Sequence, residues 1–120
     1  MRRILAVDDS TSIRQMLNFT LNKAGYEVVE AVDGKDGLAK AGGGKFDLVI
    51  TDLNMPNMDG IQMIAAVRQL PGYSFTPILM LTTESQAEKK DAGRKVGATG
   101  WIVKPFNADQ LVAAVQKLVK

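Results

Sequence analysis

The sequence contains no cysteine and no histidine. Without cysteine there is no disulfide framework, no thiol nucleophile and no thiolate metal site. Without histidine the chain lacks the commonest general base, the usual zinc ligand and any histidine-centred catalytic triad. Any metal chemistry must therefore use oxygen ligands, which favours magnesium, calcium or manganese.

Long apolar runs and a strong excess of one charge are also missing. The apolar run after the basic start, Ile4–Val7, is far shorter than the seven or so residues of a signal peptide or the roughly 20 of a membrane-spanning helix. Fifteen Lys and Arg against thirteen Asp and Glu leave a net charge of +2, with one basic cluster over Lys89–Lys95. We therefore expect a cytoplasmic protein that binds neither nucleic acid nor membrane.

The composition is that of a single globular domain. Hydrophobic residues make up 46% of the 120 residues and charged residues 23%, which argues against a disordered chain. The length is too short for two ordinary domains. We expect residues 1–120 to form one domain around one core.

Five short runs of mostly branched aliphatic residues alternate with helical patterns. The runs are Ile4–Val7, Val28–Ala31, Leu48–Ile50, Ile78–Leu81 and Trp101–Val103. They are mostly continuous rather than alternating, as in parallel strands that are covered on both faces. The pattern predicts an α/β fold: a doubly wound sheet of five parallel strands with helices on both faces. The flavodoxin-like strand order 2-1-3-4-5 is taken from known folds of this kind rather than from the sequence.

The predicted helices differ in how clearly they are patterned. The second, third and fourth cover about Gly34–Ala41, Gly60–Leu70 and Gln86–Val96. The first has an apolar stripe over Ile13–Ala24, and the last has one over Leu111–Val119 with Asn107 or Asp109 available as a cap near its start. Gly25 ends the first helix, and Gly42-Gly43-Gly44 is expected to end the second, because glycine is a poor helix former. The fourth helix is polar and weakly patterned, which is typical of a mobile or partner-facing element.

Polar side chains follow the ends of four predicted strands. They are Asp8, Asp9, Asp52, Thr82 and Lys104. Because the carboxyl ends of parallel strands share one edge and neighbouring strands lie about 4.8 Å apart, the three acids can share one cation. Clustered carboxylates repel one another, and Mg²⁺ together with a lysine ammonium would supply the compensating charge.

Each of these residues alone also has a structural explanation. Asp9, Ser10 or Thr11 could be a helix N-cap, and Asp52 could begin a turn-rich loop. Thr82 could cap a strand end, and Lys104 could be a solvated lysine before an ordinary trans proline. Their joint position at successive strand ends favours one shared site.

Four motifs occur in order along the chain. They are Val7-Asp8-Asp9-Ser10, Thr51-Asp52-Leu53-Asn54-Met55-Pro56 with Met58-Asp59-Gly60, Leu81-Thr82-Thr83-Glu84, and Lys104-Pro105-Phe106. In order and spacing they resemble the motifs of bacterial response-regulator receiver domains over essentially the whole chain. Because no output domain follows Lys120, the sequence is most similar to the stand-alone chemotaxis (CheY-like) type.

The resemblance implies a phosphoacceptor and a metal site. Asp52 would attack the phosphorus of a phosphohistidine on a sensor histidine kinase of the chemotaxis type and become an aspartyl phosphate. Asp9 and Asp52 would bind Mg²⁺ together with the main-chain carbonyl of Asn54 and waters, and Asp8 would bind it directly or through a water. Lys104 and the ion would stabilise the phosphoryl oxygens, which makes Lys104 part of the catalytic set.

The resemblance also implies a switch. Thr82 would bond to the phosphoryl group and bias a surface of helix four, strand five and helix five toward an output target, such as a flagellar motor protein. Trp101 stands where the family more often has tyrosine or phenylalanine. Taken alone it would be core filler, and its size disfavours a simple inward rotation. We nevertheless expect Trp101 to couple to the site.

The residues two places after Asp52 and Thr82 are expected to set the lifetime of the phosphoryl group. Asn54 and Glu84 would flank the path of the hydrolytic water, and this pair resembles regulators that dephosphorylate quickly. We expect a short-lived phosphoryl state, helped by a phosphatase, whose lifetime changes with substitutions at Glu84.

Three other functions compete with this one. An aspartyl-phosphatase-type enzyme needs a second aspartate where this chain has Asn54. A flavin-binding module has the same fold, but Asp8-Asp9 would repel the phosphate of the flavin. A phosphate sink or phosphorelay intermediate keeps the chemistry but lacks its own output target, and the sequence does not separate it from a signalling regulator. We expect a monomeric switch rather than a turnover enzyme.

Overall fold

The structure is a computed structural model that describes residues 2–83 and 89–119. The elements of the described residues are β1 (Arg3–Val7), α1 (Thr11–Lys23), β2 (Glu27–Ala31), α2 (Gly34–Gly43), β3 (Leu48–Asp52), α3 (Gly60–Arg68), β4 (Ile78–Thr82), α4 (Lys89–Val96), β5 (Gly100–Val103) and α5 (Ala108–Leu118). Strands and helices alternate, as predicted. Gln86, the expected start of the fourth helix, lies outside the described residues.

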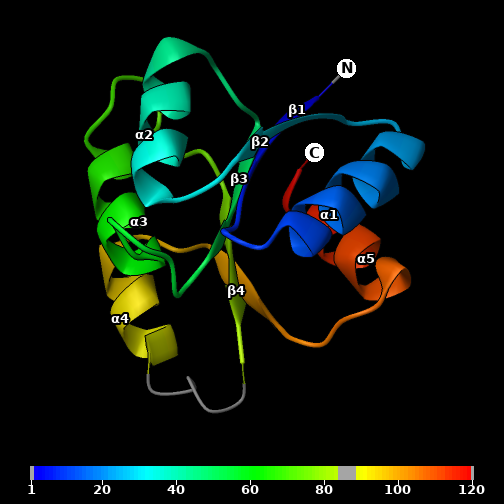
Figure 1. The fold of residues 1–120 in the computed structure, drawn as a ribbon. Coiled ribbons are helices and arrows are strands. Elements are labelled where there is room, and N and C mark those ends of the chain that lie inside the picture. The colour runs from blue at the N-terminus through cyan, green and yellow to red at the C-terminus, as the bar shows by residue number, and fades with distance from the viewer. Residues whose placement is uncertain (1, 84–88, 120) are drawn as a thin grey trace.

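The five strands form one parallel sheet in the order β2-β1-β3-β4-β5. Helices α2, α3 and α4 cover one face of the sheet, and α1 and α5 cover the other (Figure 1). The predicted fold class and strand order are therefore confirmed.

The sheet separates two apolar layers, because side chains that are adjacent along a strand point to opposite faces. Ile4 and Ala6 of β1 pack with α1 and α5, whereas Leu5 and Val7 of the same strand pack with the α2–α3 side. The strands β3 and β4 divide their side chains in the same way. This double burial explains why the central strands are continuous apolar runs in the sequence.

Two helix starts resolve choices that the sequence left open. Ser10 is the N-cap of α1, and its hydroxyl accepts the N–H of Ile13 at 3.4 Å. Asn107 is the N-cap of α5, in a reciprocal capping box with Gln110. The Asp9 carboxylate is therefore not used as a helix cap.

The predicted end of α2 was wrong by two residues, because the helix continues through Gly42 and Gly43. The hydroxyl of the buried Tyr73 lies 2.9 Å from the main-chain oxygen of Ala41 and 3.0 Å from that of Gly44. A tyrosine donor at this end of the helix, together with burial of Ala41, offsets the helix penalty of glycine, about 1 kcal/mol per residue.

The Lys104–Pro105 peptide bond is cis, whereas the sequence alone favours the ordinary trans state. Among the described residues, no helix combines the length and the apolar character that crossing a bilayer requires.

Candidate functional site

The register of the sheet brings four strand ends to one edge. Val7 pairs with Thr51, Asp52 pairs with Leu81, and Thr82 pairs with Val103. Residues at the ends of β1, β3, β4 and β5 therefore lie side by side although they are far apart in the chain. The N–H of Lys104 donates to the main-chain oxygen of Thr82 at 2.6 Å, which fixes the lysine at the same edge.

Three acidic side chains converge at this edge. Asp8, Asp9 and Asp52 each offer a carboxylate oxygen, and these oxygens lie within 4.8 Å of one another. Asp8 is fully buried and Asp52 is nearly so, whereas Asp9 is exposed. Grouped carboxylate oxygens with one exposed member are the donor set that a hard divalent cation such as Mg²⁺ prefers, so the residues present fit the predicted ion.

The ammonium of Lys104 joins two of these acids. Its Nζ atom lies 3.0 Å from Oδ1 of Asp52 and 3.3 Å from Oδ2 of Asp8. Burial works to lower the pKa of Lys104, but its hydrogen bond to Asp52 and the charges of Asp52 and Asp8 outweigh burial and raise that pKa. Lys104 is therefore a charged, partly buried member of the site rather than a solvated surface lysine.

The carboxylate of Asp52 is held on one side only. Its Oδ1 accepts the N–H of Leu53 at 2.9 Å and the Lys104 ammonium, whereas Oδ2 accepts no hydrogen bond from the described residues. Burial and then the charge of Asp8 raise the pKa of Asp52, although Lys104 acts in the opposite direction. Oδ2 is thus an oxygen available to a cation or to an electrophile.

Thr82 carries a buried hydroxyl without a partner. The residue is fully buried, and its Oγ1 atom makes no hydrogen bond in the described part of the structure. A buried polar atom without a partner costs about 1–3 kcal/mol. Thr82 follows Leu81, the partner of Asp52 in the sheet, so this unused hydroxyl belongs to the same edge of the sheet as Asp52.

The first turn of α3 rests on the backbone of Asp52. The N–H of Gly60 donates to the main-chain oxygen of Leu53 at 2.8 Å, and Asp59 caps the helix in a capping box with Gln62. A Cβ atom on Gly60 would lie 2.3 Å from the main-chain oxygen of Asp52, a distance that no real side chain tolerates. The sequence marked Asp59-Gly60 as part of a motif, but only the structure shows this contact.

The remaining predicted site residues lie in different settings. Asn54 is exposed on the loop after β3, and Glu84 lies outside the described residues. Trp101 on β5 is 36% exposed rather than core filler, and its ring contacts Lys90 and Arg94 of α4, whose charged groups lie 5.5 Å and 5.2 Å from the ring centre. The structure therefore brings together Asp8, Asp9, Asp52, Thr82 and Lys104, and places Trp101 on the α4–β5 surface.

Comparison with known proteins gives a consistent result. The family model described as "Response regulator receiver domain" matches residues 4–116. The chemotaxis response regulator CheY4 of Vibrio cholerae is 56% identical and superposes with a TM-score of 0.94, with 98% of each chain covered. Protein PilG of Pseudomonas aeruginosa is 32% identical over 114 residues, which are 95% of this chain and 84% of PilG.

A third relative was solved with a metal ion. The response regulator TrrA of Thermotoga maritima, in complex with Mg(2+)-BeF, is 36% identical and has a TM-score of 0.87, with 98% of this chain and 99% of TrrA covered. The chain spans about half the length of two longer curated relatives, of which it covers 49% and 53%. This chain belongs to the response regulator receiver domains of two-component signalling, and its acidic cluster is compatible with the Mg²⁺ that these domains bind in the active site.

Proposed function

We propose that this receiver domain takes a phosphoryl group from the phosphohistidine of a sensor histidine kinase onto Asp52. The observation that carries the proposal is the convergence of Asp8 and Asp9 on Asp52, whose Oδ1 is held by Lys104. These three acids, two of which contact Lys104, form a cation-binding site that includes a nucleophile. The CheY4, PilG and TrrA similarities support this chemistry.

The transfer step uses residues whose positions are known. A carboxylate oxygen of Asp52 forms a bond to phosphorus while the phosphorus–nitrogen bond of the phosphohistidine breaks, and the electron pair leaves with the imidazole. Asp8, Asp9 and Asp52 would hold Mg²⁺, with the main-chain carbonyl of Asn54 as a further ligand. When bound, the ion supplies positive charge to the phosphoryl oxygens. Lys104 supplies a second positive charge from the end of β5, at the same edge of the sheet.

Phosphorylation would then act through Thr82. A phosphoryl oxygen on Asp52 offers a partner to the buried Thr82 hydroxyl, which has none among the described residues. Formation of this bond would shift β4 and the neighbouring surface of α4, β5 and α5, on which Trp101 is exposed. The output partner would recognise that surface.

The proposal also covers the setting in which the domain works. We infer a monomeric switch in the cytoplasm that is phosphorylated by a chemotaxis-type kinase, is reset by hydrolysis or by a phosphatase, and acts on a motor or another motility target. The similarity to the chemotaxis protein CheY4 supports this assignment. In this role the chain modifies itself and is not a turnover enzyme.

The test is phosphorylation by a small phosphodonor, read by intact mass. Wild-type protein with Mg²⁺ should gain one phosphoryl group, the gain should disappear with EDTA, and Asp52→Asn should gain none. Asp109→Asn, on the outer helix α5, is the matched control and should behave as wild type. A phosphoryl group that forms without metal, or one that persists in Asp52→Asn, would overturn the proposal.

A separate experiment addresses the output. Wild type and Asp52→Asn, each treated with Mg²⁺ and phosphodonor, would be compared for binding to a candidate motility target. Binding by the phosphorylated wild type alone supports a signalling output. Equal binding by both proteins, or binding by neither, would remove this part of the proposal and leave the phosphate-sink function.

A further inference from the structure

A second layer of polar contacts lies behind the acidic cluster and is centred on Arg14 of α1. Its side chain is only 12% exposed. Nη1 donates to the main-chain oxygen of Asp8 at 2.7 Å, and Nη2 donates to the hydroxyl of Thr11 at 3.2 Å. Nε lies 3.3 Å from Oε1 of Glu30 on the neighbouring strand β2. One guanidinium therefore connects the loop between β1 and α1 to the edge of the sheet.

The contact with Asp8 matters because that carbonyl belongs to the peptide group that leads into Asp9. The peptide group is planar, so fixing the carbonyl oxygen of Asp8 fixes the direction in which the Cα atom of Asp9 leaves it. The Asp8 carboxylate has further supports, since Oδ1 accepts the N–H of Ser10 at 2.9 Å and Oδ2 faces Lys104. The Asp9 carboxylate makes no hydrogen bond or ion pair with any described residue. Its orientation therefore depends on its backbone, and Arg14 holds the carbonyl of the peptide group that precedes it.

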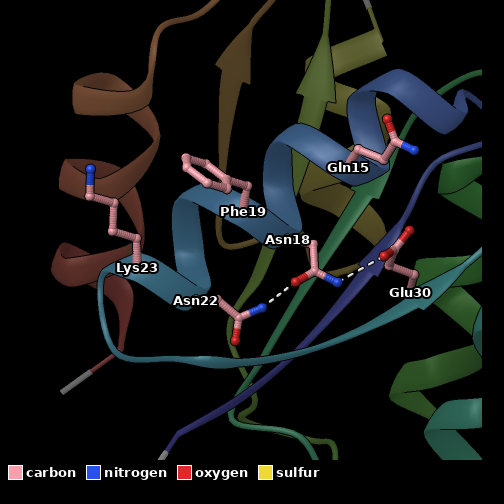
Figure 2. A pocket seen from close by; sticks show the side chains of 6 residues that line it. All are labelled: Gln15, Asn18, Phe19, Asn22, Lys23 and Glu30. Carbon is pink, nitrogen blue, oxygen red and sulfur yellow. Dashed lines mark hydrogen bonds between the residues drawn. The ribbon is translucent and has the colours of Figure 1, made fainter.

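Glu30 aims the guanidinium. Its other carboxylate oxygen, Oε2, accepts the amide of Asn18 at 2.8 Å, and Asn18 in turn accepts a hydrogen bond from Asn22 (Figure 2). The main-chain oxygen of Glu30 accepts a hydrogen bond from the ammonium of Lys40 at 2.6 Å. Glu30 is thus fixed by both α1 and α2. This series of side-chain hydrogen bonds links the surface hollow of Figure 2 to the loop that carries the metal ligands.

We propose that Arg14, aimed by Glu30, is a positioning residue that presets Asp9 for Mg²⁺. The inference rests on the proposed function, because it assumes that the acidic cluster binds this ion. Residues that orient metal ligands change metal affinity by about 10- to 100-fold when they are removed. We expect the lower end of this range, since Arg14 acts on the main chain of the loop.

A purely electrostatic role for Arg14 predicts the opposite sign. A guanidinium near a divalent cation repels it, so removal of the charge alone would tighten Mg²⁺ binding. Loss of a positioning contact weakens binding instead. The direction in which the Mg²⁺ affinity changes when Arg14 is removed therefore distinguishes the two roles, whatever the size of each effect.

The experiment is a titration with MgCl₂ that is followed by the backbone amide NMR signals of the β1–α1 loop. Arg14→Met should bind Mg²⁺ about tenfold more weakly than wild type. Arg14→Lys should recover part of the affinity, because an ammonium can reach the Asp8 carbonyl but cannot contact Glu30 and Thr11 at the same time. Lys23→Met removes one charge from the far end of the same helix and should leave the affinity unchanged.

A second readout separates positioning from loss of folding. In single-turnover phosphorylation, Arg14→Met should need more Mg²⁺ for half-maximal rate, while the rate at saturating Mg²⁺ stays near that of wild type. If Arg14→Met does not fold in EDTA, Arg14→Lys carries the test, because it keeps the positive charge but cannot keep the contacts with Glu30 and Thr11, so weaker Mg²⁺ binding reports the lost contacts. Unchanged or tighter binding in the folded variants would overturn the inference. Failure of the wild type itself to bind Mg²⁺ would instead overturn the proposed function.

Discussion

The ammonium of Lys104 lies 3.0 Å from Asp52 and 3.3 Å from Asp8, so one lysine neutralises carboxylates at the ends of two neighbouring strands. The lysine itself follows β5, two strands away from β3. In the absence of a metal ion, this bridge is the main positive charge that the described residues place against the buried acids. Lys104 therefore has two roles, in the stability of the metal-free protein and in the chemistry proposed for Asp52.

The first prediction concerns Lys104→Met. Removal of two charge-assisted hydrogen bonds should lower the free energy of unfolding of the metal-free protein by about 2 kcal/mol near neutral pH. Mg²⁺ should reduce the difference in unfolding free energy between Lys104→Met and the wild type, because the ion supplies the missing positive charge. Urea unfolding in EDTA and in MgCl₂ measures both effects. The exposed Lys117→Met on α5 should change stability by less than about 0.5 kcal/mol, and an equal loss in both variants would contradict the prediction.

The second prediction concerns pH. Burial and the charge of Asp8 raise the pKa of Asp52 above its ordinary 3.8, so the folded protein holds this proton more tightly than the unfolded chain does. The stability that the protonated carboxyl contributes is fully present below pH 3.8 and is lost as the pH rises through the raised pKa.

Metal-free wild type should therefore lose unfolding free energy relative to Asp52→Asn as the pH rises from 3.8 through the raised pKa of Asp52. Mg²⁺ binding should strengthen over the same range, because the ion and the proton compete for the carboxylate. Urea unfolding of both proteins in EDTA across this range is the measurement. Parallel stability curves for the two proteins would show that Asp52 does not titrate as described.

The third prediction concerns Thr82→Val. The substitution replaces a buried hydroxyl that has no partner among the described residues with a methyl group of similar size, so stability should rise by about 1 kcal/mol. The phosphoryl group on Asp52 would then lack its hydrogen-bond donor, so phosphorylation should still occur but should no longer alter the α4–β5 surface. Thermal unfolding measures the change in stability, and intact mass measures whether phosphorylation still occurs. A marked loss of stability would mean that the hydroxyl is already bonded.

The fourth prediction uses Trp101, the only tryptophan of the chain. Its ring contacts Lys90 and Arg94, so movement of α4 or β5 changes the charges around the indole. Mg²⁺ and phosphodonor together should change tryptophan emission in the wild type and leave that of Asp52→Asn constant. Emission that does not respond in fully phosphorylated wild type would show that Trp101 is not coupled to the site.

Much of the site could be predicted from the sequence, because parallel strands place their carboxyl ends at one edge. Once the runs before Asp8, Asp52 and Lys104 are read as strands, the convergence of these residues follows from topology alone. The same reasoning could not supply the 3.0 Å contact of Lys104 with Asp52, which depends on a side-chain conformation.

Contacts between distant segments were beyond the reach of local patterns. Tyr73, which caps α2 from another part of the chain, explains why two glycines stay helical. The ring of Trp101 lies against two cations of α4 rather than in the core, and the α4 sequence alone shows only a basic cluster. Arg14 is one of several polar residues on α1, and nothing in its spacing indicates that it reaches the carbonyl of Asp8.

The close approach of Gly60 to the backbone of Asp52 places the start of helix α3 directly against the residue that carries the reacting carboxylate. No side chain lies between them to absorb a displacement, so a push on the outer face of α3, where Gln62 is exposed, is transmitted to the peptide that carries the carboxylate. An antibody fragment or small protein raised against that face would therefore slow the phosphorylation of Asp52 without contacting the acidic cluster.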